Sequence, residues 1–315
     1  MNGRDFRFGH KSDIADLQHE SVMRAPYNKL GIGLAILGVF LFGGTLPATR
    51  LAIIAIDPLF LTAARAAIAG IAGIAVLFVM RRPIPPILLW REILLAGLCT
   101  IVGFPLFTAL AMVSVPAAHG GIVLGILPLA TTAAAMLVAR ERPAAGFWLV
   151  SLLGSAIVIG FVLSESHARN FALGDFLLLG TVMAGAFGYA LSGRLSLIMS
   201  GWEVISWQVV AFLPISALLA FVLWPRDLAS IPLGAWTGLA YVGLVSQYLA
   251  FFVFNAAMAL SGVARVGQFM LLQPFVIIIL AAFVNGEPIR IATLAYAAAV
   301  VATVLIGQQM PVRRK

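Results

Sequence analysis

A single arginine interrupts a long apolar segment. Arg65 lies in the stretch LTAARAAIAG, residues 61–70, inside a mostly apolar run over residues 58–80. Lipid cannot solvate a guanidinium, so this side chain is expected to face the interior of a helix bundle or a cavity. All Asp and Glu residues lie in the N-terminal tail or near the ends of apolar segments, so none is an evident deep partner. Arg65 therefore either attracts an anionic group such as a carboxylate, or bonds backbone carbonyls and locks helices together.

Amide and aromatic side chains lie within other apolar segments. Burying an amide in lipid is costly unless it is paired, so each glutamine is expected to face protein or water. Several that converge indicate a polar cavity, whereas hydrogen bonding between helices explains any single one. Aromatic rings among them either contact a substrate or simply pack. The cavity candidates besides Arg65 are Trp207, Gln208, Gln247, Gln268, Gln273 and Tyr189.

Two prolines fall in the middle of apolar segments, Pro128 and Pro274. A proline inside a helix frees the carbonyl four residues earlier and tends to kink the helix. We expect such a kink to expose backbone dipoles to a cavity and to give a bending point. A static packing kink is the alternative.

Three titratable residues near the ends of these segments are candidates for a gate or a proton switch. Histidine side chains ordinarily titrate near neutral pH, so His119 suits a switch, although an interfacial histidine often has no such role. Glu141 and Glu287 end their predicted helices, where the helix dipole disfavours an anion. We therefore interpret both glutamates as structural or gating elements, not as ligands of a substrate.

The composition sets the class of protein that positions these residues. Of 315 residues, 62% are hydrophobic and 10% are charged, against about 25% charged in soluble domains. The chain is therefore predicted to be an all-α integral membrane protein. A spanning helix needs about 20 apolar residues, and ten candidates have roughly that length. They cover residues 30–49, 58–80, 92–113, 117–139, 146–163, 173–193, 204–224, 234–258, 262–284 and 290–309.

Charge placement predicts the orientation. With the N-terminus inside, 15 of the 20 Lys and Arg residues fall in cytoplasmic segments and four in outer ones, as cytoplasmic loops prefer. Residues 1–28 are then a cytoplasmic tail, and residues 310–315 a basic cytoplasmic C-terminus. The net charge of +8 does not indicate a nucleic-acid partner, because the basic residues sit in short clusters between apolar runs. The single cysteine, Cys99, excludes an internal disulfide framework and a Cys-based metal cluster.

An internal repeat divides the chain. Shifted by 146 positions, residues 109–143 align with residues 255–289 without a gap, and the alignment pairs Pro128 with Pro274 and Glu141 with Glu287. The first repeat is predicted over residues 29–163 and the second over residues 164–309, with five helices each. An odd number of helices inverts the second repeat in the membrane, and inverted repeats are typical of secondary transporters.

The motifs resemble a known family. The most specific pieces are GGTLPATRLAI (43–53), DPLFLTAARAAIAG (57–70) and VPAAHGGIVLGILPLATT (115–132) followed by RERP. In the second half, GVARVGQFMLLQPF (262–275) is followed by GEP. The chain resembles members of the drug/metabolite transporter superfamily built from two EamA-type domains. That resemblance implies a ten-helix carrier of the bacterial inner membrane, and many such carriers export amino acids, other metabolites or drugs.

Three functions are compatible with these features. An alternating-access exporter of amino acids or related small metabolites explains the repeat, the prolines and the buried polar groups. A multidrug exporter of cationic compounds with the same fold is the alternative, and a non-transporting membrane protein is a third. An enzyme is not expected: the histidines lie in the tail or near the outer side and form no catalytic or metal-binding constellation. No cofactor is predicted, and the partners are a small-molecule substrate and the lipid bilayer.

Overall fold

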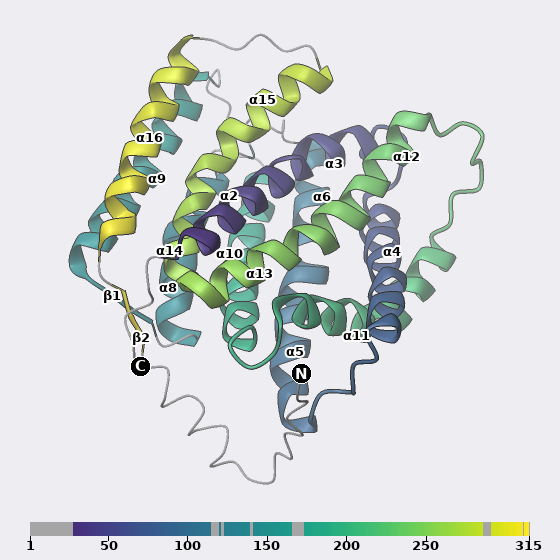
Figure 1. Cartoon of the computed structure of the whole chain (residues 1–315). Helices are drawn as coiled ribbons and strands as arrows, with labels where there is room; N and C mark the ends of the chain where they lie inside the picture. Colours follow the sequence, from purple (N-terminus) through teal and green to yellow (C-terminus); the bar gives the residue numbers. More distant parts are fainter. Residues whose placement is uncertain are drawn as a thin grey trace.

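The computed structural model describes residues 28–114, 120, 123–138, 141–165, 173–285, 291–310 and 312–314, which are mostly helical (Figure 1). The predicted N-terminal tail lies outside these residues, apart from Asn28, and so do His119 and Glu287. The helices of the first half are α2 (Lys29–Gly43), α3 (Thr45–Ile53), α4 (Pro58–Val79), α5 (Ile87–Gly97), the π-helix η1 (Leu98–Gly103), α6 (Phe104–Ser114), α8 (Leu127–Val138) and α9 (Ala145–Glu165). Those of the second half are α10 (Leu173–Leu195), α11 (Gly201–Val222), α12 (Leu233–Ala240), the π-helix η2 (Tyr241–Leu249), α13 (Ala250–Ser261), α14 (Val263–Gln268), the 3₁₀-helix η3 (Phe269–Leu272), α15 (Gln273–Asn285) and α16 (Ile291–Gln309).

Six helical stretches within the described residues are long and apolar enough to cross a membrane. They are Lys29–Ile53, Pro58–Val79, Ile87–Ser114, Phe176–Leu195, Gly201–Val222 and Leu233–Ser261. Shorter apolar helices lie where the other spans are predicted: Leu127–Val138, Ala145–Ile157, Val263–Ile277 and Ala298–Gly307. The chain is thus a multi-pass helical membrane protein, and the count of ten spans stays a prediction.

The distribution of side chains is that of a protein in lipid. Large apolar side chains such as Phe78, Phe221 and Phe283 are about four-fifths exposed, at 82%, 78% and 83%. By contrast, charged and amide side chains such as Arg65 and Gln208 are buried. Backbone and side-chain polar groups must find partners inside the bundle, because lipid supplies none.

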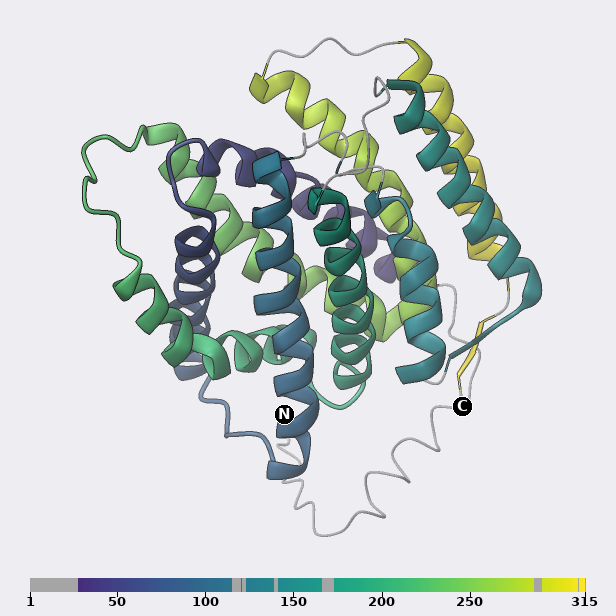
Figure 2. The ribbon, with the colours of Figure 1, turned by 180° about the vertical axis from the view of Figure 1, so that it is seen from behind.

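The two halves of the chain pack closely against each other. Helix α4 lies along α11, α2 along α13, and α3 along α12. Small residues permit this contact: a Cβ on Gly70 of α4 would lie 2.9 Å from Leu213 Cβ and 3.1 Å from the carbonyl oxygen of Val209 on α11. Small residues at helix contacts are the usual means of close packing in membranes. Helices α9 and α16 pack together at one edge (Figures 1 and 2).

The paired prolines each lie where a regular α-helix begins after an interruption, and the kinks expected of them stay a prediction. Pro128 is the second residue of α8 and follows a turn. Pro274 is the second residue of α15 and follows the 3₁₀-helix η3. The first turn of a helix tolerates proline, because its N–H would have no intrahelical acceptor there. Both helical stretches are therefore interrupted just before the proline, at matching places.

Two short strands are a departure from the all-helical prediction. The strands β1 (Glu141–Pro143) and β2 (Val312–Arg314) pair antiparallel, with Glu141 opposite Arg314. The pairing joins the segment after α8 to the C-terminal segment after α16, on the lower side of Figure 1.

Candidate functional site

Arg65 is buried in the contact between α4 and η2. Its side chain is 3% exposed, and Nη2 donates a long hydrogen bond of 3.4 Å to Ser246 Oγ. Ser246 Oγ is also 2.7 Å from Thr45 Oγ1 on α3. Arg65 Nε has no hydrogen-bond partner among the described residues. The guanidinium therefore carries a full charge in a buried site with incomplete pairing.

Local sequence features hold Arg65 in this place. Helix α4 begins at Pro58, and the side chain of Asp57 caps it by accepting the backbone N–H groups of Leu59 and Phe60. On the facing π-helix, a Cβ at Gly243 would lie 3.5 Å from Arg65 Cα. The absence of a side chain at Gly243 lets the two backbones approach, so that Ser246 reaches the guanidinium.

A second buried polar cluster surrounds Gln208 on α11. Its side chain is 0% exposed, its Oε1 accepts from Thr100 Oγ1 at 3.1 Å, and its Nε2 donates to Ser192 Oγ at 3.0 Å. Both polar atoms of the amide are thus engaged. This cluster ties α11 to η1 and α10.

Gln247 donates a hydrogen bond to a backbone carbonyl that has no partner within the π-helix η1. Within η1 the N–H of Phe104 donates to Cys99 O, one residue earlier than in an α-helix. The carbonyl of Thr100 then faces Pro105, which has no N–H. Gln247 Nε2 donates to Thr100 O at 3.0 Å and supplies the missing partner. Its Oε1 has no partner within the described part of the chain.

The other cavity candidates do not gather around Arg65. Gln268 donates to Ser151 on α9, and Gln273 makes a 3.4 Å hydrogen bond to the carbonyl of Phe42 on α2. Trp207 packs edge-on against Trp90, with ring centroids 6.0 Å apart. These residues lie in separate parts of the bundle.

The last candidate, Tyr189, belongs to an aromatic cluster. Its ring lies against the rings of Phe42, Phe251 and Phe254, with centroids 5.2 to 6.1 Å apart. The tyrosine is buried, so this geometry is that of core packing.

Glu141 binds the start of a helix rather than the end of one. Its side chain is 2% exposed, and its two oxygens accept the backbone N–H groups of Val263 and Ala264 at 2.8 Å each. The preceding residue, Gly262, has φ 92°, a value that glycine adopts readily. The N-terminus of α14 attracts an anion through its dipole and its unpaired N–H groups. The start of α14 thus favours this carboxylate, a contact that the prediction from the end of its own helix did not include.

Two ion pairs lie at the same end of the bundle as Glu141. Arg82 Nε is 3.1 Å from Glu203 Oε1, and Arg194 Nη2 is 3.3 Å from Glu92 Oε1. Arg194 also makes a long contact of 3.5 Å with the carbonyl of Val138, the last residue of α8. These contacts join the end of α4 to the start of α11, and the end of α10 to α5 and α8.

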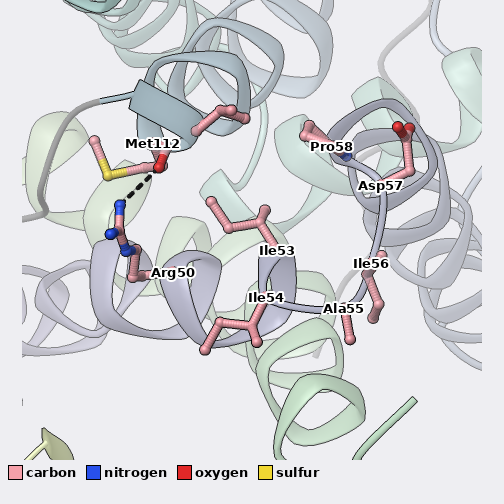
Figure 3. Close-up of a pocket in the computed structure, with 9 residues that line it drawn as sticks. Arg50, Ile53, Ile54, Ala55, Ile56, Asp57, Pro58 and Met112 are labelled. Carbon is pink, nitrogen blue, oxygen red and sulfur yellow. Dashed lines mark hydrogen bonds between the residues drawn. The ribbon is translucent and has the colours of Figure 1, made fainter. Parts of the chain in front are cut away.

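A pocket of about 460 Å³ opens at the opposite end of the chain's first spans (Figure 3). It is lined by Arg50, Met112, Val113 and the loop of residues 53–58. Arg50 Nη1 donates to Met112 O at 2.8 Å, which joins α3 to α6. Asp57 lines the same pocket, but its carboxylate caps α4. Within the described residues, no cluster of His, Cys, Asp or Glu could hold a metal ion.

The sequence reasoning did not single out the hydroxyl partners Thr45, Thr100, Ser192 and Ser246. One signal was available: the repeat shift of 146 positions places Thr100 on Ser246, both three residues before the end of a π-helix. Hydroxyl groups are common in apolar helices, so the sequence match alone does not single out these two residues. Their equal positions in the two π-helices do.

Comparison with known proteins agrees with this architecture. Residues 29–163 and residues 172–307 each match the EamA-like transporter family. The uncharacterized transporter YdeK of Bacillus subtilis (strain 168) is 39% identical over 273 residues, which cover 87% of this chain and 95% of that protein. The uncharacterized transporter YwfM of the same organism is 26% identical over 256 residues, or 80% and 84% of the two chains. A solved structure described only as a crystal structure of a protein superposes with TM-score 0.73 at 19% identity, over 90% of this chain and 99% of the other.

Proposed function

Because the chain belongs to the EamA-like transporter family, which it matches twice, we propose that it is a secondary transporter that exports amino acids or related small metabolites by alternating access. The observation that carries the proposal is the buried, incompletely paired guanidinium of Arg65. A carboxylate that enters the bundle would supply the anionic partner that this side chain lacks. Ionisable groups inside membrane helices commonly mark substrate pathways.

The proposal includes ten spans arranged as two inverted five-helix repeats in the bacterial inner membrane, with both termini in the cytoplasm. The four shorter apolar helices support the count, since each lies where one of the remaining spans is predicted. The excess of Lys and Arg in the predicted cytoplasmic segments supports the orientation.

The proposal also includes a gate at the cytoplasmic end, which the contacts between the two matched stretches support. The pairs Arg82–Glu203 and Arg194–Glu92 each join one stretch to the other. So does the clamp of Glu141 on the start of α14. All three join helix ends that the predicted topology places in the cytoplasm. In this proposal the observed conformation is closed on that side, and the contacts break when the carrier opens to take up substrate.

Transport by inverted membrane vesicles tests the proposal. Vesicles from cells with and without the protein would be supplied with labelled amino acids, nucleosides and cationic drugs, with and without a proton gradient. We expect uptake of a carboxylate-bearing compound by the wild type and its loss in Arg65→Ala. Arg226→Ala, which removes an exposed arginine between α11 and α12, is the control.

Other results of the vesicle experiment would favour one of the alternative functions or a structural role for Arg65. Normal transport by Arg65→Ala, at equal amounts of inserted protein, would show that the guanidinium does not bind substrate. Uptake of cationic drugs alone would favour the multidrug exporter and leave Arg65 a structural role. Uptake of no compound in the panel would favour the non-transporting alternative.

A further inference from the structure

Three buried side chains on α3, α4 and η2, the elements that meet at Ser246, each have an unused hydrogen-bonding atom. They are Nε of Arg65, Oε1 of Gln247 and Oγ1 of Thr49. Arg65 is bonded to Ser246, and Gln247 is the next residue on η2. Thr49 lies one helical turn after Thr45, whose hydroxyl is 2.7 Å from Ser246 Oγ.

A buried hydrogen-bonding atom without a partner is energetically unfavourable unless a ligand or a water molecule bonds to it. A buried polar atom without a partner keeps its full desolvation cost, and native structures contain few of them. Three on the adjoining elements α3, α4 and η2 therefore indicate a place where a polar molecule binds, because each unused atom would gain a partner there.

The type of each atom restricts what can bind. Arg65 Nε is a charged donor and suits a carboxylate. Gln247 Oε1 can only accept, and its orientation is fixed: turning the amide over would set its oxygen against the carbonyl of Thr100, to which Nε2 now donates. The hydroxyl of Thr49 can donate or accept. The contact between α4 and η2 thus presents both a donor for an anion and an acceptor for an N–H group.

From this arrangement we infer that Gln247 determines specificity by accepting a hydrogen bond from the ammonium of a zwitterionic substrate while Arg65 binds the carboxylate. The inference rests on the proposed transport function and adds a second recognised group. A carboxylate without an ammonium leaves Gln247 Oε1 unpaired, and an amine without a carboxylate meets the charge of Arg65. Sites built to hydrogen-bond an N–H group reject analogues that lack it.

Competition in wild-type inverted vesicles tests this without any variant. The labelled protein amino acids are supplied first, to find one that is taken up. Uptake is then challenged with an excess of its analogue without the amino group and its analogue without the carboxyl group; for leucine these are isocaproate and isoamylamine. We expect each analogue to compete about tenfold or more weakly than the unlabelled amino acid.

A variant then assigns the effect to the amide. Gln247→Met keeps a similar volume but removes the acceptor oxygen, together with the Nε2 donor to Thr100 O. Without the acceptor, the preference for the amino acid over its des-amino analogue should fall by about tenfold. Asn255→Leu is the matched control: Asn255 Nδ2 donates to Gly201 O at 3.0 Å and its Oδ1 has no partner among the described residues, but it lies on α13, against the start of α11. The ratio of the two competitors should not change in that control.

Different experimental outcomes would contradict this inference and the proposed transport function. If isocaproate competes as strongly as leucine in the wild type, the protein still transports carboxylates, but Gln247 does not recognise the ammonium and the inference is overturned. An unchanged ratio in an inserted Gln247→Met protein also overturns it. Uptake of none of the amino acids contradicts both the inference and the export of amino acids.

Discussion

Arg65 and Gln208 occupy the same position in two helices of equal length, and each is bonded to a hydroxyl on a π-helix of the other half. Each lies seven residues after the first residue of a 22-residue helix, α4 or α11. Arg65 is bonded to Ser246 of η2, and Gln208 to Thr100 of η1. The two pairs are alike in geometry but not in chemistry: the amide is fully engaged, whereas the guanidinium is charged and incompletely paired. This asymmetry places the proposed anion site beside the first repeat's helix α4.

Replacing Arg65 with glutamine, the residue type at the same position of α11, distinguishes the two roles considered for the arginine. Arg65→Gln can still accept or donate to Ser246, so a purely structural lock would survive. A neutral amide cannot attract a carboxylate, so we expect transport to fall by two or more powers of ten, about 3 kcal/mol. Vesicle uptake at equal protein levels measures the effect. A rate near that of the wild type would make Arg65 a lock between helices.

Gln208 is expected to act on stability. Gln208→Leu leaves Ser192 Oγ without the amide donor and removes the acceptor of Thr100 Oγ1, which keeps its bond to Ala96 O. Loss of buried hydrogen bonds of this kind costs about 1–3 kcal/mol. Thermal unfolding of the purified protein in detergent should show a lower midpoint, whereas the exposed Gln309→Leu on α16 should not change it. An unchanged midpoint for Gln208→Leu would mean that water replaces the lost contacts.

The sequence predicts which segments leave water, but not how each helix is rotated. The burial of Arg65 and Gln208 follows from hydropathy alone. Gln268 and Gln273 lie in equally apolar segments, yet their side chains contact α9 and α2 instead of η2. Hydropathy averages over a whole turn, so it carries little information about which neighbour a side chain meets.

The missed features depend on contacts between residues far apart in the chain. Glu141 is 122 residues from Val263, and only the packing of the halves shows that its carboxylate caps a helix start. Likewise, the repeat aligns Pro128 with Pro274 correctly, but it does not reveal that each follows an interruption of the helix. The repeat thus identifies which residues of the two halves correspond, but it does not predict the backbone conformation around them.

The contact between α4 and α11 is expected to tolerate no side chain at Gly70. In Gly70→Val the Cβ would lie 2.9 Å from Leu213 Cβ and 3.1 Å from Val209 O, and a backbone atom cannot move aside cheaply. Overpacking of this kind costs about 1–3 kcal/mol. The thermal midpoint in detergent should fall, and transport should fall with it. Gly33→Val is the control, since nothing lies within 4 Å of its Cβ position; equal effects of the two variants would contradict the packing argument.

The clamp of Glu141 on α14 is expected to keep the cytoplasmic end closed. Glu141→Gln keeps one acceptor oxygen but sets an NH₂ group against a backbone N–H and removes the charge that the helix N-terminus favours. We expect the clamp to weaken by about 1–3 kcal/mol, which raises the population open on that side. The reporter is Ser261→Cys at the end of α13, buried beside the clamp, in a Cys99→Ala background. Labelling by a membrane-impermeant maleimide in inverted vesicles should be faster with Glu141→Gln.

A reporter at the other end of the bundle provides the control for this experiment. Thr237→Cys on α12 lies near the opposite end of the helical stretch Leu233–Ser261 from the clamp. Its labelling in right-side-out vesicles should not become faster with Glu141→Gln. If the clamp only supports folding, both reporters will label faster as the protein loosens. Faster labelling confined to Ser261→Cys would identify Glu141 as part of a gate, because only an opening of the cytoplasmic end exposes that position.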